Sequence, residues 1–82
     1  MSYRRVLTGE GLIMLVSRNV RRLRFEAGLS AREVAERGGM PLRSLQRIEA
    51  GRANVTFDTL AELALGLGVD VEELFRAPPK KR

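Results

Sequence analysis

The chain has 82 residues and a formal net charge of +5, and it contains neither cysteine nor histidine. A chain of this length forms one small hydrophobic core, and the absence of both residue types excludes disulfide frameworks and the common zinc sites. The sequence therefore predicts a single domain with no metal and no cofactor, and no catalytic residues, because no nucleophile, base and orienting group share a motif.

Charge is distributed unevenly along the chain. Residues 1–52 contain eleven arginines against five acids, whereas residues 53–75 contain five acids and no base. Residues 76–82 add four bases. This asymmetry favours a polyanionic partner for the first part of the molecule. An evenly mixed distribution would instead indicate an ordinary solvated surface.

An apolar run occurs near the start of the chain, at residues 11–16. It is far shorter than the roughly 20 residues needed to cross a bilayer, and no small-residue cleavage site of the signal-peptide type follows it. We therefore expect a soluble, cytoplasmic protein with no membrane partner.

Apolar residues on one helical stripe predict a first helix that ends at Gly28. The stripe comprises Leu12, Leu15, Val16, Val20 and Leu23. The start of this helix stays open, because residues 3–8 and 12–16, joined by Gly9-Glu10-Gly11, also fit a short hairpin. Residues 1–14 are accordingly expected to be an N-terminal extension of unassigned structure.

A second helix is predicted from about Ala31, because Ser30-Ala31-Arg32-Glu33 has the form of a capping box. The pair Gly38-Gly39 ends this helix, since glycine adopts the left-handed conformation that closes one.

The third helix begins at about Pro41, which lacks the amide hydrogen that a first helical position leaves unused. It runs to about Ala50 and ends at Gly51. Leu45 and Ile48 face the core. The opposite face carries Leu42, Arg43, Gln46 and Arg47.

Two further helices complete the chain. Thr56 or Asp58 caps the fourth helix, whose apolar set is Phe57, Leu60, Leu63, Ala64 and Leu67. Asp70-Val71-Glu72-Glu73 has the form of a second capping box and opens a short fifth helix with Leu74 and Phe75. Residues 77–82 contain Pro78-Pro79 and are expected to be a flexible basic tail.

Two short helices joined by a tight glycine turn, inside a basic all-α chain, have the layout of a helix-turn-helix. The turn sets the second helix at a steep angle to the first, so that its amino end and one face project. Such a corner fits a DNA major groove about 12 Å wide. We therefore expect residues 15–76 to form a five-helix DNA-binding domain.

Several segments occur together in an order and spacing that are specific as a set. They are Leu23-Arg24, Gly28-Leu29-Ser30, Glu33-Val34-Ala35-Glu36, Gly39, Leu45, Arg47-Ile48-Glu49-Ala50-Gly51, Leu60 through Leu67-Gly68-Val69, and Glu73-Leu74-Phe75. Over residues 18–75 the chain thereby resembles the Cro and phage-repressor (XRE) family. The resemblance implies a lambda-repressor-like fold and a sequence-specific transcriptional regulator of bacterial or phage type.

The resemblance implies that residues at the start of the third helix, and one a turn later, touch base edges. These are Leu42, Arg43, Ser44 and Arg47. Each guanidinium can donate twice to guanine O6 and N7, so the operator half-site is expected to contain guanine, whereas Leu42 offers only apolar contact, for instance to a thymine methyl. The alternative for the two arginines is solvent-facing charge with weak pairing to Glu36 or Glu49.

Contacts to DNA phosphates, which fix the register of the protein on the duplex, are assigned to Arg32, Arg52 and Asn54. Amides at the start of the second helix also favour an anion. Asn54 has an equal alternative role in supporting the turn into the fourth helix. Ala31 stands where relatives often have a phosphate-binding glutamine, which shifts that contact to Arg32 or to the amides.

Arg24 and Glu49 are expected, from the resemblance, to form a partly buried structural ion pair between the first helix and the end of the third. The alternative is an exposed glutamate in a common helical motif.

One such domain touches few base pairs, so we expect a homodimer that reads a palindromic operator, more as a repressor than as an activator. Two surfaces fit the dimer contact: the set Val69, Val71, Leu74 and Phe75, and residues 3–14. The competing interpretation is a protein-interaction module, such as an antitoxin or coactivator-like domain, with a toxin or another protein as its partner. A restriction-modification controller, an antitoxin and a plain regulator stay open as subclasses.

Overall fold

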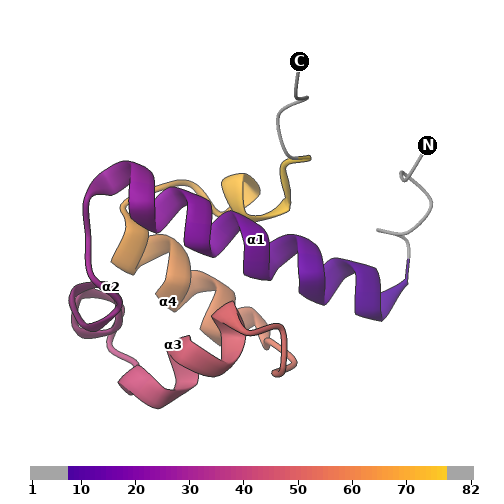
Figure 1. The fold of residues 1–82 in the computed structure, drawn as a ribbon, viewed down its shortest axis with the longest axis horizontal. Helices are drawn as coiled ribbons and strands as arrows, with labels where there is room; N and C mark the ends of the chain where they lie inside the picture. Colours follow the sequence, from indigo (N-terminus) through magenta and orange to yellow (C-terminus); the bar gives the residue numbers. More distant parts are fainter. Residues whose placement is uncertain (1–7, 78–82) are drawn as a thin grey trace.

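The structure, a computed structural model, describes residues 8–77 as an assembly of helices without a strand (Figure 1). The elements are α1 (Gly9–Ala27), α2 (Ala31–Gly38), α3 (Leu42–Glu49), α4 (Phe57–Leu67) and the 3-10 helix η2 (Val71–Phe75). The predicted all-α class is confirmed, with helices in the predicted order. The fifth, however, is a 3-10 helix and not an α-helix.

Helix α1 begins at Gly9. Thr8 caps it by accepting a hydrogen bond from the amide of Gly11 at 2.8 Å. The alternative hairpin is therefore wrong over residues 12–16, while residues 1–7, which would supply most of its first strand, lie outside the described residues. Residues 9–14 are the first turns of α1.

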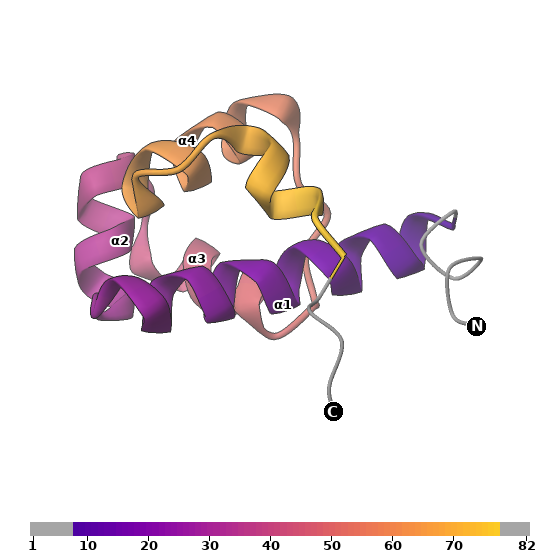
Figure 2. The same ribbon diagram turned by 90° about the horizontal axis from the view of Figure 1, so that it is seen from above.

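The apolar stripe of α1 is buried at Leu15, Val16, Val20 and Leu23. Leu12 is 40 % exposed. The reason is visible in Figure 2, where the first turns of α1 extend past α4 and η2 and leave the body of the molecule.

Side-chain caps begin α2 and α4. The Ser30 hydroxyl accepts from the Glu33 amide at 3.0 Å, and the Glu33 carboxylate accepts from the Ser30 amide at 2.8 Å, so the predicted capping box is present. At the start of α4 the Thr56 hydroxyl accepts from the Thr59 amide at 3.1 Å. The cap of α4 is therefore Thr56 and not Asp58.

The turn between α2 and α3 consists of Gly39, Met40 and Pro41. Gly39 has a φ of 76°, the left-handed conformation that closes α2. The sequence predicts Pro41 at the first position of the third helix, but Pro41 precedes α3, because its backbone is extended, with φ −64° and ψ 144°. Its carbonyl accepts hydrogen bonds from the amides of Ser44 and Leu45, which begin the helix.

Two predictions about the C-terminal half are wrong. Asp70 makes no side-chain capping bond. Its carbonyl accepts instead from the Glu73 amide three residues on, which is the 3-10 pattern. Phe57 belongs to the apolar set predicted for the fourth helix, but it is 89 % exposed. As the first residue of α4 it lies outside the turn that packs inward, which begins at Leu60.

Every helical element contributes one completely buried apolar side chain to a single core. These are Val20, Val34, Leu45, Leu63 and Leu74, each with no exposed surface. The short elements are therefore stabilised by one another, since isolated helices of eight residues are marginal in water. Within residues 8–77, no helix has the length and apolar character required to cross a membrane.

Helices α2 and α4 pack backbone against backbone at one end of the molecule (Figure 2). A Cβ atom added at Gly38 would collide with the carbonyl oxygen of Glu62, and one added at Gly66 would collide with the carbonyl oxygen of Val34. Glycine at both positions therefore allows an approach that no other residue would permit.

An ion pair joins α1 to the last residue of α3. The Arg24 guanidinium donates twice to the Glu49 carboxylate, at 2.7 and 3.0 Å, and the two side chains are 14 % and 12 % exposed. A third bond from Arg24 reaches the Leu29 carbonyl at 3.1 Å. The hydrogen bonds to Glu49 raise the pKa of Arg24 above its ordinary value, against the opposing effect of burial. Arg24 thus connects α1, the segment before α2 and the end of α3.

Replacing Gly38 by alanine is expected to destabilise the fold by about 1–3 kcal/mol, because the added methyl group forces α2 and α4 apart. The higher helix propensity of alanine, about 1 kcal/mol, offsets this only in part. Gly9→Ala is the matched control, since no heavy atom lies within 4 Å of an added Cβ there. Urea unfolding followed by circular dichroism compares the two, and equal stabilities would contradict the close packing.

Replacing Arg24 by alanine is expected to cost about 3 kcal/mol of stability, because the Glu49 carboxylate loses its charged partner in a mostly buried place. The control is Arg76→Ala, which removes the arginine of the exposed pair with Glu73 and should change stability little. Thermal unfolding distinguishes them. If both variants unfolded at the same temperature, the ion pair of Arg24 and Glu49 would contribute nothing to stability.

Candidate nucleic-acid interface

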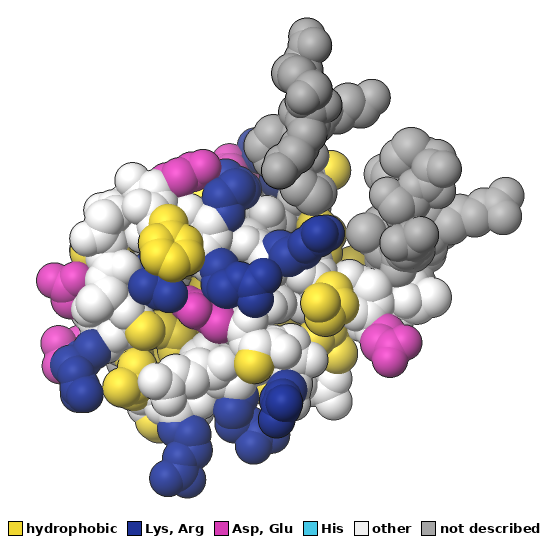
Figure 3. Space-filling view, viewed as in Figure 1, with side chains coloured by type: hydrophobic (Ala, Val, Ile, Leu, Met, Phe, Trp, Pro, Cys, Tyr) yellow, Lys and Arg dark blue, Asp and Glu magenta, His cyan; other side chains and the backbone are white. Residues whose placement is uncertain are grey.

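Helix α3 has one buried face and one free face. Leu45 and Ile48 enter the core, whereas Arg43, Gln46 and Arg47 are exposed. Figure 3 shows basic side chains projecting from the lower edge of the molecule, the edge at which α3 lies in Figure 1. The free face of α3 is therefore a basic, outward-facing surface.

Arg43 and Arg47 lie one turn apart on this face, and no side chain in residues 8–77 forms an ion pair or hydrogen bond with either of them. The alternative pairing with Glu36 or Glu49 is absent from the described residues, and Glu49 is engaged by Arg24. Both guanidinium groups are consequently available to an external acceptor.

Leu42 and Ser44, at the start of α3, are half-buried. Leu42 packs in part against the core, so its apolar surface is shared between the protein and the solvent. Both residues border the free face, close to Arg43 in sequence, but less of each is available for contact with a partner.

The three residues expected to bind phosphates are all exposed. Arg32 is the second residue of α2, and Arg52 and Asn54 lie between α3 and α4. The Asn54 side chain donates no hydrogen bond to the turn into α4 among the described residues, where Thr56 provides the cap instead. This leaves Asn54 available for an outside partner.

The start of α2 is less suited to an anion than the sequence alone indicates. The Glu33 carboxylate bonds to the Ser30 amide, and these bonds with Ser30 hold the pKa of Glu33 below its ordinary value. A carboxylate that stays ionised at this helix end opposes a nearby phosphate. Ala31 is half-buried and has no donor, so a phosphate contact here depends on Arg32.

Sequence reasoning missed three polar residues of α1: Ser17, Asn19 and Arg21. Ser17 and Arg21 donate to the main-chain carbonyl of Glu49. Asn19 is buried and donates to the carbonyls of Leu74 and Arg76, both at 2.8 Å, which fixes η2 against α1. Their position in the sequence is the signal that could have found Ser17 and Asn19. Ser17 lies three residues before Val20 and Asn19 three residues after Val16, so both lie beside the apolar stripe.

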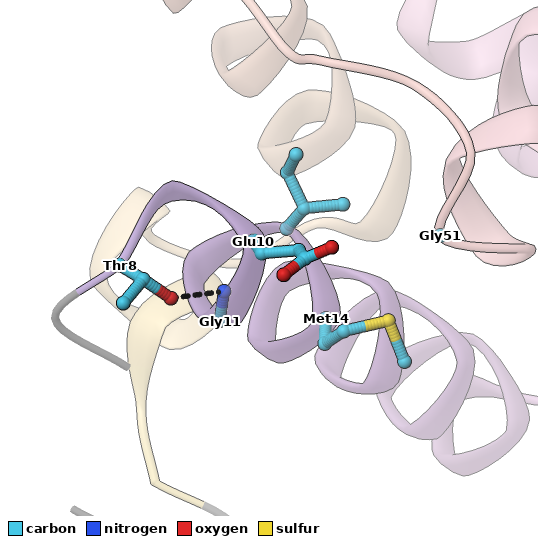
Figure 4. Close-up of a pocket in the computed structure, with 6 residues that line it drawn as sticks. Thr8, Glu10, Gly11, Met14 and Gly51 are labelled. Atoms are coloured by element: carbon cyan, nitrogen blue, oxygen red, sulfur yellow. Dashed lines mark hydrogen bonds between the residues drawn. The ribbon is translucent and has the colours of Figure 1, made fainter. Parts of the chain in front are cut away.

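The described residues also enclose a shallow hollow of about 420 Å³ between the first turns of α1 and Gly51 (Figure 4). The carboxylate of Glu10 and the side chain of Met14 border it. No group of three or more His, Cys, Asp or Glu side chains within residues 8–77 is arranged to hold a metal ion. The arginine face of α3 is the more distinctive surface.

Known proteins share both the sequence pattern and the fold. The helix-turn-helix family matches residues 20–74. The chain is 48 % identical, over 60 residues, to a Sinorhizobium fredii protein named "Uncharacterized HTH-type transcriptional regulator y4dJ", an alignment that covers 73 % of this chain and 78 % of that protein.

Two solved structures are similar over most of the chain. The restriction-modification controller protein C.AhdI from Aeromonas hydrophila has 28 % identity and a TM-score of 0.73, over 77 % of this chain and 96 % of that one. The hypothetical transcription factor NHTF from Neisseria has 27 % identity and a TM-score of 0.77, over 82 % and 77 %. Taken with the exposed arginine face of α3, these similarities show that the chain belongs to the helix-turn-helix family of Cro and phage-repressor (XRE) type, a family of DNA-binding transcriptional regulators and not of enzymes.

Proposed function

We propose that this protein binds a palindromic operator as a homodimer, with α3 of each subunit in the major groove, and represses transcription by occupying the site. The observation that carries the proposal is the pair of exposed arginines, Arg43 and Arg47, which have no partner among the described residues. Guanidinium groups recognise guanine by two parallel hydrogen bonds, to O6 and N7.

The dimensions of α3 fit this role. An α-helix with its side chains is about 10–12 Å in diameter, which matches the major groove width of about 12 Å, and the eight residues of α3 form a rod about 12 Å long at 1.5 Å per residue. Arg43 and Arg47 are about 6 Å apart along its axis, which is about two base-pair steps of 3.4 Å. Leu42 and Ser44 provide the neighbouring contacts, apolar to a thymine methyl and polar to a base edge.

Arg32, Arg52 and Asn54 are the proposed phosphate contacts. They belong to segments on either side of α3 in the chain, the start of α2 and the loop into α4. Backbone contacts of this kind fix the register of the recognition helix without reading sequence. The acidic side chains between residues 58 and 73 would then face away from the DNA, which keeps the protein oriented as it approaches.

Dimerisation follows from the small reading surface. The described part of the chain is 36 Å in its longest dimension, and symmetric half-sites in such operators lie about 34 Å apart. We place the contact on the C-terminal surface, where Val71 and Phe75 are 42 % and 41 % exposed; the alternative is the start of α1, where Leu12 and Met14 are 40 % and 48 % exposed. Leu74, in contrast, is completely buried and belongs to the core.

Control of a restriction-modification operon is a second candidate, favoured by the likeness to C.AhdI. It differs from plain repression in the location of the operator and not in the chemistry of binding. The competing protein-interaction module, with a toxin or other protein as partner, predicts no preference for one duplex over random DNA. Specific DNA binding instead weakens steeply as salt rises, because binding releases counterions from the DNA and higher salt makes that release less favourable.

Selection of bound duplexes from a random pool is expected to return a palindrome with guanine in each half-site. Arg43→Ala should then lose about 1–3 kcal/mol of discrimination at one base pair per half-site. Arg52→Ala should weaken binding to all sequences and reduce the slope of log affinity against log salt by about one. Arg37→Ala, which removes an exposed charge from the other end of α2, is the control. Identical effects of Arg43→Ala and Arg52→Ala would contradict the division into base and phosphate contacts.

The dimer surface is tested by Phe75→Asn, which removes an aromatic side chain that is 41 % exposed. The variant is expected to sediment as a monomer at concentrations at which the unchanged protein is a dimer, since interfaces depend on a few large apolar anchors. Phe25→Asn removes an even more exposed aromatic residue from α1 and should leave the dimer intact. Sedimentation equilibrium that gave monomers in all three cases would argue against the homodimer.

A further inference from the structure

The last residue of α3 is bound by three side chains of α1 at once. The carbonyl oxygen of Glu49 accepts from the Ser17 hydroxyl at 2.7 Å and from the Arg21 guanidinium at 2.6 Å. Its carboxylate accepts the two bonds from Arg24. The three donors are four and three residues apart and therefore share one face of α1.

These bonds satisfy a carbonyl that a helix end leaves without an intrahelical partner. Among the described residues, both donors to the Glu49 carbonyl are side chains of α1. Ser17 has no exposed surface, so its hydroxyl reaches the carbonyl from the buried side, at a partly buried place. Two donors from different turns of α1 that converge on one oxygen restrict movement of α3 along and across its own axis.

The position of this restraint matters for base reading. Arg47 and Arg43 lie two and six residues before Glu49. Because α3 is about 12 Å long, a rotation of about 5° around its carboxyl end would move its amino end by about 1 Å. Recognition sites need their contacting groups held within about 0.5 Å of the productive geometry. Loss of the bonds at Glu49 would therefore misalign the reading residues without touching them.

We infer that Ser17 and Arg21 are positioning residues for DNA recognition, and that they set the sequence discrimination of α3 through the main-chain carbonyl of Glu49. The inference rests on the proposed function, since it presupposes that α3 reads bases. It assigns to these residues a role distinct from that of Arg24, whose bonds go to the Glu49 side chain. In this role Arg21 differs from the arginines that are proposed to contact phosphate.

The test compares Ser17→Ala and Arg21→Ala with Arg18→Ala. Arg18 is exposed on the same helix and has no ion pair or hydrogen bond with the described residues. Arg18→Ala therefore removes the same charge as Arg21→Ala but leaves the bonds to α3 intact. Affinity is measured for the selected operator, for duplexes with one substituted base pair and for random duplex. All measurements are made at one salt concentration and at a temperature at which every variant is folded by circular dichroism.

Ser17→Ala and Arg21→Ala are each expected to reduce the preference for the operator over the substituted duplexes by about tenfold, while binding to random duplex changes no more than in Arg18→Ala. Arg21→Lys, which keeps one donor and the charge, should restore most of the preference. The double variant should lose less than the product of the two single losses, because both donors share one acceptor. If Ser17→Ala folds poorly, the exposed Arg21 and its lysine rescue carry the test.

A uniform loss of affinity across all duplexes in Arg21→Ala would overturn the inference and identify Arg21 as a phosphate contact. An operator preference that is unchanged in both Ser17→Ala and Arg21→Ala would also overturn the inference. Arg43→Ala is included to distinguish failure of the inference from failure of the proposed function. If Arg43→Ala relaxes the preference but Ser17→Ala and Arg21→Ala do not, only the positioning role is wrong. If Arg43→Ala has no effect, α3 does not read bases and the proposed function fails as well.

Discussion

The close crossing of α2 and α4 at Gly38 and Gly66 is the constraint on which the rest of the structure depends. Where two helices touch backbone to backbone, neither can slide or roll without a collision. This contact fixes α2 on the body of the molecule. Because only three residues separate α2 from α3, fixing α2 also fixes the point from which α3 departs. The position of α3 thus depends on two glycines that lie in the interface between α2 and α4.

The other end of α3 is held by chemistry of a different kind. Its carboxyl terminus is attached to α1 through the ion pair of Arg24 and Glu49 and through hydrogen bonds to the Glu49 carbonyl. An eight-residue helix has little intrinsic stability, so α3 needs attachments at both ends to keep one orientation. The buried face, with Leu45 and Ile48, provides the third attachment.

Local signals in the sequence were sufficient for most of the fold. The capping box at Ser30, the glycines that end α1 and α2, and the apolar periodicity predicted helix boundaries within a few residues, because each depends on neighbours in the chain. The outward direction of Arg43 and Arg47 followed from the same periodicity. The joint position of Arg24 and Glu49 could be anticipated only from the family resemblance, since the two residues are 25 positions apart.

The features that could not be predicted depend on tertiary packing. Phe57 is exposed because it lies ahead of the buried residues of α4, which begin at Leu60, and a 3-10 helix follows Asp70 in place of a capped α-helix; local composition encodes neither outcome. The same holds for Ser17, Asn19 and Arg21, whose partners are main-chain carbonyls of distant segments. A carbonyl is present at every residue, so the sequence carries no mark of which one a donor will meet.

Separation of the proposed base-reading residues from the packed interior has an evolutionary consequence. Arg43 and Arg47 make no side-chain hydrogen bond or ion pair with the described part of the chain, and surface positions of this kind tolerate exchange at little energetic cost. Duplicated copies of such a gene could acquire new target sites by one or two substitutions while the scaffold stayed intact. A lineage could in this way build several regulators on one ancestral fold, none of which binds the target site of another.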